Sequence, residues 1–240
     1  MSENGEIPLE VRKRMVELAG ICAQVQGTAK TSRLLDLVRA SKEKILVFSR
    51  FAATLEELGD SLTRAKISFS SFTGRQSAQE KVAAVEAFRT GNVPVMLCSE
   101  IGGEGHNLQF CSTLVNFDLP WNPMKIEQRI GRIHRIGQER PVHIYNLCAR
   151  GTAEDHILEV LDRRINLFEL VIGEVDLILG QMKNEAEFEE RILAIYGESR
   201  SDEEVKGGFE ELGAELERAK KRYDKVKQLD SAIFSNDYEV

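Results

Sequence analysis

The chain has 240 residues, of which 42% are hydrophobic and 30% are charged, and its formal net charge is −7. This length allows one substantial core, and the negative charge excludes a protein that holds nucleic acid through a global positive field, so any such contact needs a local basic surface. No apolar run approaches the roughly 20 residues of a membrane span, so we expect no membrane partner and a cytoplasmic location.

In chain order, the pattern starts with helix-like segments up to residue 43 and then alternates between strands and helices. The predicted strands are residues 44–49, 67–72, 93–99, 113–118 and 142–147. The predicted helices between them are residues 52–65, 77–89 and 122–136. This alternation indicates βαβ units, so we expect an α/β fold with a doubly wound parallel sheet and helices on both faces.

Two predicted helices carry clear start signals. The helix after the fourth strand is predicted to begin with Asn122 as N-cap and Pro123 at its first position, and to end at Gly137. A later helix is predicted to begin with Thr152 as its cap, ahead of Asp155. The segment after it is charge-dense, and we expect a solvated helix that packs on the domain or on a partner.

Five unusual segments follow the predicted strand ends. In chain order they read SRF, FTGR, SEIGGEGHN, DLPWNP and ARGT. In doubly wound parallel sheets, ligands bind beyond the carboxyl ends of the strands. We therefore expect these segments to line one functional edge.

The segment QRIGRIHRIGQ, residues 128–138, places basic side chains on one side of its predicted helix. At about 100° per residue, Gln128, Arg132 and Arg135 lie within about 60° of one another. The isoleucines at 126, 130 and 133 lie on the opposite side. Two guanidinium groups on successive turns match a multi-oxygen anion such as a triphosphate, although a surface helix with salt-bridged arginines would show the same spacing.

The glycine-rich segment 99–107 follows a strand and opens a short helix-like run. Such an arrangement turns backbone N–H groups toward an anion, and Ser99 and Asn107 could add hydrogen bonds from their side chains. A tight connection between two elements would have the same composition.

Nothing in the sequence supplies a complete nucleotide site. The segment QVQGTAKTS offers Lys30 and Thr31, but a phosphate loop needs glycines where this chain has Gln24 and Ala29. No strand is followed by an acidic pair for a metal ion, and the four cysteines show no CxxC pairing, which indicates reduced core residues and no metal site. The chain thus offers arginines for a nucleotide without a phosphate cradle.

Between about residues 30 and 173 the sequence resembles the second RecA-like lobe of a Snf2-family motor of helicase superfamily 2. The resemblance rests on five segments: KILVFSRF, FTG, SEIGGEGHNLQF, FDLPWNP and QRIGRIHRIGQ. It implies a RecA-like sheet with a C-terminal helical extension. It also implies ATP and Mg²⁺ shared with an N-terminal RecA-like lobe of the same parent protein, which would carry the phosphate loop and the metal carboxylate.

The resemblance assigns roles to the nucleotide side of the lobe. Arg132 and Arg135 would be the arginine fingers that reach the γ-phosphate, with Gln128 supporting them. Gly103, Glu104 and Gly105 would lie between the nucleotide and the DNA. As half of an ATP-dependent double-stranded DNA translocase, the chain alone is predicted to be inactive.

The resemblance also implies a grip on the phosphate backbone of double-stranded DNA. The predicted contacts are Ser49, Arg50, Thr73, Gly74, Ser99, Asn107 and Trp121. Trp121 resembles part of the Snf2 coupling segment, and packing at the entry of a helix is the alternative role for it. In a bacterial source the protein would be associated with the nucleoid.

Some positions depart from the pattern of many Snf2 members. Glu100 and His106 lie inside the glycine-rich motif, which is similar to the distant bacterial group that includes the RNA-polymerase-associated motor. Glu80 and Lys81 stand where the family often has an arginine contact. These departures weaken an assignment to chromatin.

We expect four parts along the chain. They are a helical lead-in at 1–29, the RecA-like lobe at 30–150, a brace-like helix at 151–182 and a charged helical tail at 183–240, which could bind a protein partner. Two alternatives remain: a non-catalytic RecA-like adaptor that binds a protein, and an RNA-directed lobe of superfamily 2.

Overall fold

The computed structural model describes residues 8–22, 27–100, 108–134, 140–170, 173–182 and 188–235. Its strands are β1 (Ile45–Phe48), β2 (Phe69–Phe72), β3 (Val95–Cys98), β4 (Thr113–Asn116) and β5 (His143–Asn146). Its helices are α1 (Leu9–Cys22), α2 (Ala29–Ala40), α3 (Ala52–Arg64), α4 (Ala78–Thr90), α5 (Pro123–Ile130), α6 (Ala153–Ile165), η1 (Leu167–Glu169), α7 (Glu174–Leu179), α8 (Phe188–Glu198) and α9 (Asp202–Ser235). All five predicted strands are confirmed, each shorter than predicted by one residue or more at one end or both.

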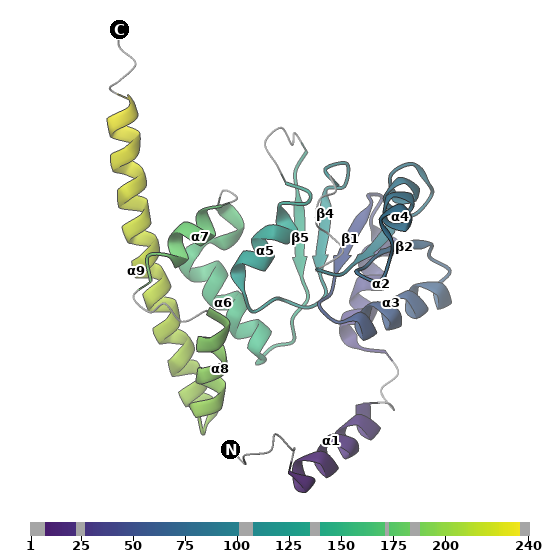
Figure 1. The fold of residues 1–240 in the computed structure, drawn as a ribbon, viewed down its shortest axis with the longest axis horizontal. Helices are drawn as coiled ribbons and strands as arrows, with labels where there is room; N and C mark the ends of the chain where they lie inside the picture. The colour runs from purple at the N-terminus through teal and green to yellow at the C-terminus, as the bar shows by residue number, and fades with distance from the viewer. Residues whose placement is uncertain are drawn as a thin grey trace.

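The strands form one parallel sheet in the order β2-β3-β1-β4-β5 (Figure 1). The last residues of the strands lie level with one another, since Phe48 pairs with both Cys98 and Asn116. Phe72 pairs with Cys98, and Asn116 pairs with Asn146. All segments that follow the strands therefore leave from the same edge of the sheet, as the sequence predicted.

Helices cover both faces of the sheet because the inner strands are apolar on both sides. On one face, α2 and α3 pack Leu34, Leu58 and Leu62 against alternate strand residues such as Val47. On the other face, α4 packs Val85 and Phe88 against residues such as Leu46 and Met96. This arrangement confirms the doubly wound α/β fold.

A third apolar cluster lies beside the sheet and joins α5 to the C-terminal helices (Figure 1). It contains Ile126 of α5, Ile157 and Leu161 of α6, and Leu212 and Leu216 of α9, all at most 1% exposed. The helical extension therefore packs on α5, and α5 lies between the sheet and the extension.

The predicted start of α5 agrees with the structure, and its predicted end does not. Asn122 is the N-cap of α5 and accepts a hydrogen bond from the Met124 N–H, and Pro123 is the first helical residue. The predicted end is wrong, because α5 ends at Ile130 with Gly131 as its C-cap, and residues 131–133 form a turn. Gly137 lies outside the described residues.

The cap predicted at Thr152 is also wrong in its chemistry. Thr152 occupies the N-cap position of α6, but its side chain caps no helical N–H. Its hydroxyl instead donates to the Ala149 carbonyl at 2.7 Å. The Asp155 carboxylate accepts from the Gly151 N–H at 2.8 Å, so the turn before the helix uses both side chains.

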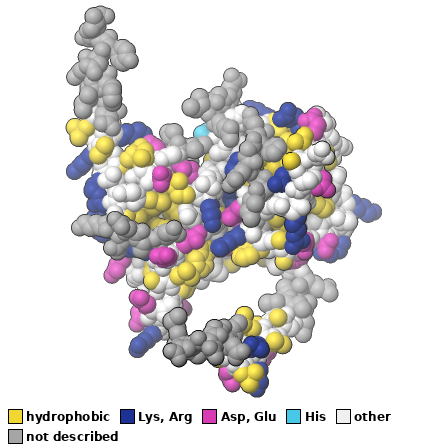
Figure 2. All heavy atoms as spheres, viewed as in Figure 1, with side chains coloured by type: hydrophobic (Ala, Val, Ile, Leu, Met, Phe, Trp, Pro, Cys, Tyr) yellow, Lys and Arg dark blue, Asp and Glu magenta, His cyan; other side chains and the backbone are white. Residues whose placement is uncertain are grey.

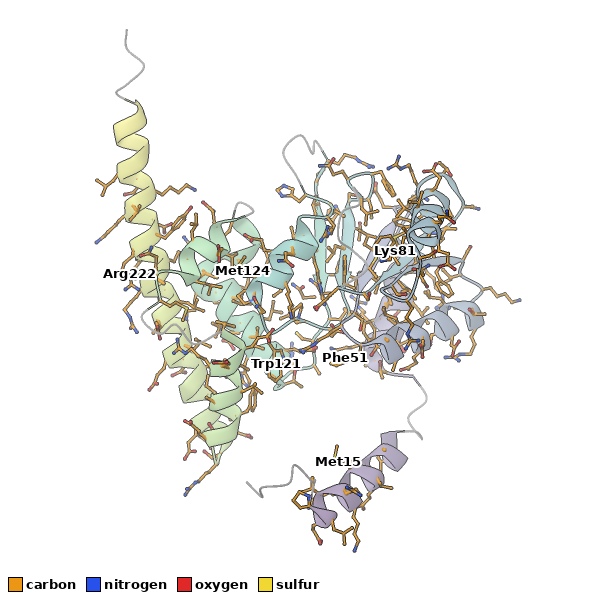
Figure 3. The ribbon with its side chains drawn as sticks, in the orientation of Figure 1. Met15, Phe51, Lys81, Trp121, Met124 and Arg222 are labelled. Carbon is orange, nitrogen blue, oxygen red and sulfur yellow. The ribbon has the colours of Figure 1, made fainter. Side chains whose placement is uncertain are left out.

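Helix α1 lies away from the sheet, and its labelled residue Met15 is 55% exposed (Figures 1 and 3). Within the described parts of the chain, no helix is both long enough and apolar enough to cross a membrane.

Candidate functional site

A cavity of about 610 Å³ opens at the carboxyl ends of β1, β2 and β3. Four residues that the sequence predicted for nucleic-acid contact line it together, namely Arg50, Thr73, Gly74 and Ser99. The structure therefore brings most of the predicted strand-end residues into one hollow, although these residues come from three separate segments of the chain.

The wall of this cavity is apolar and its mouth is charged. Leu55 and Gly59 of α3 and Phe69 of β2 form part of the wall. A Cβ at Gly59 would lie 3.0 Å from the Phe69 ring, so glycine lets α3 approach β2 closely at this point. The Arg75 guanidinium lies 2.6 Å from the Glu56 carboxylate at the exposed mouth.

The basic charge of this edge is local. Arg50 and Arg75 share the lining with Glu56 and Asp60. On the face drawn in Figure 2, basic and acidic side chains lie interspersed. Attraction to an anion at this edge would therefore act over short distances and would be screened readily by salt.

Asp118, just beyond the end of β4, organises the loop that follows β1. Its carboxylate accepts hydrogen bonds from the Arg50 N–H at 2.9 Å and from the Ser49 hydroxyl. The Ser49 side chain is completely buried in this contact. A ligand contact by Ser49 would thus require its hydroxyl to leave Asp118, whereas Arg50 and Thr73 are already at the cavity.

Arg129 is the most buried charged side chain at this edge, with 3% exposure. Its guanidinium donates to the Glu100 carboxylate at 2.9 Å, to the Asn116 side-chain oxygen at 2.8 Å and to the Asp118 carbonyl at 2.8 Å. It also lies 3.5 Å from the Asp118 carboxylate. One side chain of α5 thus joins the segments that follow β3 and β4.

This network explains why an acid stands at position 100. Glu100 pairs with Arg129, and the Lys125 ammonium lies 3.9 Å from the same carboxylate. Glu100, which departs from the pattern of many Snf2 members, therefore has a buried partner in this chain. The helical wheel of residues 128–138 did not reveal this network, because it singled out Gln128, Arg132 and Arg135 and gave Arg129 no role.

The three predicted catalytic residues are described in part. Gln128 is exposed on α5, and Arg132 lies half-buried in the turn that follows α5, where its N–H donates to the Arg129 carbonyl at 3.1 Å. Burial strongly raises the pKa of the Cys98 thiol at the end of β3, while the charges of Arg129 and Arg132 lower it by a smaller amount.

Several predicted site residues lie outside the described part of the chain. They are Arg135 and the glycine-rich residues Gly103, Glu104, Gly105 and Asn107, together with His106.

Trp121 lies between the sheet and the C-terminal helices, as does Met124 of α5 (Figure 3). Both are partly buried against the cluster that joins α5 to α6 and α9. This is the packing expected for a residue at the entry of a helix, and it leaves part of the indole exposed.

The remaining singled-out residues have structural partners. The Lys30 ammonium lies 2.5 Å from the Glu154 carboxylate and 3.2 Å from the Phe117 carbonyl, so it ties α2 to α6. Glu80 forms a capping box with Ser77 at the start of α4, and Lys81 lies over the Phe72 ring. The capping box was readable from the spacing of Ser77 and Glu80.

Cys98, Cys111 and Cys148 are free thiols. Cys98 and Cys111 are buried, as the sequence indicated, and Cys148 is half-buried. Burial raises the pKa of Cys111 to about 11, so this thiol stays protonated at neutral pH and is a poor nucleophile. No group of three or more His, Cys, Asp or Glu side chains suited to a metal occurs among the residues described.

Comparison with known proteins points to one family. Residues 29–137 match the helicase conserved C-terminal domain. The uncharacterized ATP-dependent helicase YqhH of Bacillus subtilis (strain 168) is 44% identical over 183 residues, which are 76% of this chain and 32% of YqhH. The RNA polymerase-associated protein RapA of Vibrio vulnificus (strain YJ016) is 40% identical over 147 residues, which are 60% of this chain and 15% of RapA.

The fold also matches a solved structure. The Sulfolobus solfataricus SWI2/SNF2 ATPase core in complex with dsDNA superposes with a TM-score of 0.50 and 25% identity, over 59% of this chain and 31% of that core. The chain thus spans about a third or less of each of these relatives.

Proposed function

Because this chain is the RecA-like C-terminal lobe of a Snf2-family helicase, we propose that it works as the second half of an ATP-dependent motor that moves along double-stranded DNA. In this proposal the lobe supplies arginine fingers to ATP that a first lobe holds. It also grips the DNA phosphate backbone with its strand-end edge.

The observation that carries the proposal is the position of Arg132. It follows α5 directly, and α5 is fixed to the strand ends by the buried Arg129. Catalysis of phosphoryl transfer consists mainly of positioning and charge stabilisation, so an arginine on a rigidly held turn suits a finger. Arg135, which lies outside the described residues, would act beside Arg132, and the exposed Gln128 would support both.

The proposal assigns the nucleotide cradle to the other lobe. Bound ATP would supply the transferable phosphoryl group, and Mg²⁺ would neutralise part of the charge on the phosphates. This lobe would contribute its guanidinium groups to the phosphates and, through Gly103, Glu104 and Gly105, a backbone between the nucleotide and the DNA. We place the metal carboxylates in the first lobe.

The DNA grip is proposed for the cavity edge. Arg50 offers a charge, Thr73 and Ser99 offer hydroxyl groups, and Gly74 allows close approach of a phosphate to the backbone. Such contacts carry no sequence information, which suits movement along any sequence. The similar Sulfolobus solfataricus core, whose structure is in complex with dsDNA, supports duplex DNA as the partner.

The isolated chain is expected to bind ATP poorly and to show no hydrolysis above background, because a complete site would need the phosphate loop of the first lobe. Steady-state phosphate release by residues 1–240, measured with and without duplex DNA, checks this. The matched positive control is the same lobe joined to its first lobe. Robust DNA-stimulated turnover by the isolated chain would rule out the half-site.

The isolated chain is also expected to bind duplex DNA weakly, without sequence preference, and less tightly as salt rises. Fluorescence anisotropy at several salt concentrations measures this. Arg50→Ala should weaken binding uniformly across sequences and lower the salt slope by about 1, and Thr73→Ala should weaken it less. Arg163→Ala, an exposed arginine on α6, is the control.

Two results would contradict the proposed DNA edge. One is tight binding that salt does not change, and the other is binding that neither Arg50→Ala nor Thr73→Ala weakens. Duplex RNA of equal length serves as competitor, and if it competed better than DNA, the RNA-directed alternative would replace the DNA proposal.

A further inference from the structure

Helix α5 is held by two separate sets of contacts. Arg129 anchors it to the strand ends through Asn116 and Asp118. Ile126 anchors it to the apolar cluster of the C-terminal helices, where it is completely buried. The turn that carries Arg132 begins at the end of this helix, so any shift of α5 moves that turn.

Glu127 makes a polar contact from α5 to the C-terminal helices. Its carboxylate accepts hydrogen bonds from the Gly173 N–H at 2.8 Å and from the Val175 N–H at 3.3 Å, at the start of α7. Glu127 is only 7% exposed. A carboxylate that accepts backbone N–H groups at a helix start forms strong, charge-assisted bonds, and burial protects them from water.

The same helix start is tied to α9. Glu174, the first residue of α7, accepts hydrogen bonds from the Tyr223 hydroxyl at 2.9 Å and from the Lys227 ammonium. Both donors belong to α9, which also packs against α6. A continuous chain of contacts therefore runs from α9 through α7 to Glu127, five residues before Arg132.

We propose that Glu127 is a positioning residue for ATP hydrolysis, through which the helices α7 and α9 hold α5 in the orientation that presents Arg132. The inference rests on the proposed function of Arg132. It assigns the C-terminal helices an effect on turnover that is transmitted through α5.

The backbone supports this transmission. The Gly131 N–H donates to the Glu127 carbonyl at 2.8 Å, and the Arg132 N–H donates to the Arg129 carbonyl. Glu127 and Arg129 therefore anchor α5 with their side chains and accept hydrogen bonds from the turn with their carbonyls. Because the reaction depends on the exact place of the guanidinium, a displacement of about 1 Å can lower the rate by about a hundredfold.

The first test uses Glu127→Ala and Glu127→Gln. In the 240-residue chain, Glu127→Ala should speed amide hydrogen exchange in residues 123–132 and at the start of α7, whereas Glu127→Gln, which keeps an acceptor oxygen, should change it little. Glu190→Ala, at an exposed position on α8, is the matched control. Unchanged hydrogen exchange in Glu127→Ala would by itself refute the proposal that Glu127 holds α5 to the start of α7.

The second test measures hydrolysis by the two-lobed protein on saturating DNA. Glu127→Ala should lower kcat about tenfold to a hundredfold with little change in KM for ATP, and Glu127→Gln should recover most of the loss. Tyr223→Phe combined with Lys227→Ala should lower kcat in the same direction, with Lys225→Ala on the same helix as control. Normal kcat in Glu127→Ala would overturn the positioning role.

These readouts separate the inference from the proposed function. If Arg132→Ala kept normal turnover, the finger assignment would fail whatever Glu127 did. If Arg132→Ala lost turnover but Glu127→Ala did not, the finger would stand and the positioning residue would fall. If kcat and KM of the Glu127 variants changed only in proportion to the fall in melting temperature, Glu127 would have a purely structural role.

Discussion

Replacing Arg132 or Arg135 with alanine should lower kcat for DNA-stimulated ATP hydrolysis by about 10³-fold or more in the two-lobed protein. The reason is that a finger stabilises charge that develops on the phosphate oxygens in the transition state. Ground-state binding of ATP should weaken only mildly, because the first lobe provides most of the grip. Steady-state hydrolysis on saturating DNA, combined with nucleotide titration, measures both quantities.

The lysine variants sharpen this test. Lysine keeps the charge but lacks the planar fork that contacts two phosphate oxygens, so Arg132→Lys and Arg135→Lys should recover little of the lost activity. Arg163→Ala is the control for removal of an exposed arginine. Near-normal turnover by folded Arg132→Ala and Arg135→Ala proteins would show that the arginines are structural.

Much of the fold was predictable because its signals are local. Apolar runs such as that around Val47 mark strands that are buried on both faces, and the turns that follow them hold the unusual residues. Parallel pairing then puts the strand ends at one edge, so the meeting of Arg50, Thr73 and Ser99 follows from topology alone. The Asn122 cap was equally predictable, because the cap, the proline after it and the N–H that it accepts from lie within three consecutive residues.

The long-range contacts of α5 were not predictable in the same way. A helical wheel gives the direction of a side chain at its base, but the Arg129 guanidinium reaches Asn116 and Asp118 in a segment 11 to 13 positions earlier. Glu127 likewise finds its partners 46 and 48 positions later. No local pattern marks such partners, which the tertiary structure supplies.

The early end of α5 has a related cause. The prediction assumed one helix over residues 122–136, but α5 ends at Ile130. Ile133, in the turn that follows, is buried in the cluster that α4 forms with the sheet. Ile126 and Ile133 were predicted to share one packed side. They are both buried, but in different clusters, because the turn redirects the chain between them.

Arg129→Ala should be the most destabilising substitution at this edge. It would remove the buried donor of the Asp118 carbonyl and leave the Glu100 carboxylate with only the Lys125 ammonium, 3.9 Å away. Removing one partner of a buried ion pair typically costs about 3–5 kcal/mol, because the remaining charge is uncompensated. For a chain of this size, that corresponds to a fall in Tm of roughly 6–20 °C.

Thermal melts of the 240-residue chain without ATP or DNA measure this effect apart from catalysis. Arg163→Ala, on the exposed face of α6, should change the free energy of unfolding by less than about 0.5 kcal/mol. The double variant Arg129→Met with Glu100→Gln should regain part of the loss, because it also removes the carboxylate that lost its buried partner. An Arg129→Ala melt that matched the wild type would show that the buried network contributes nothing.

Turnover of the arginine variants must therefore be compared together with their melting temperatures. A loss of turnover in Arg129→Ala is expected together with a lower Tm, because the buried network at the strand ends is broken. Arg132 is less buried than Arg129, so Arg132→Ala should lose turnover with a smaller fall in Tm than Arg129→Ala. Measuring kcat and Tm on the same samples therefore separates the finger from the anchor, and a large fall in Tm for Arg132→Ala would assign Arg132 to the anchor instead.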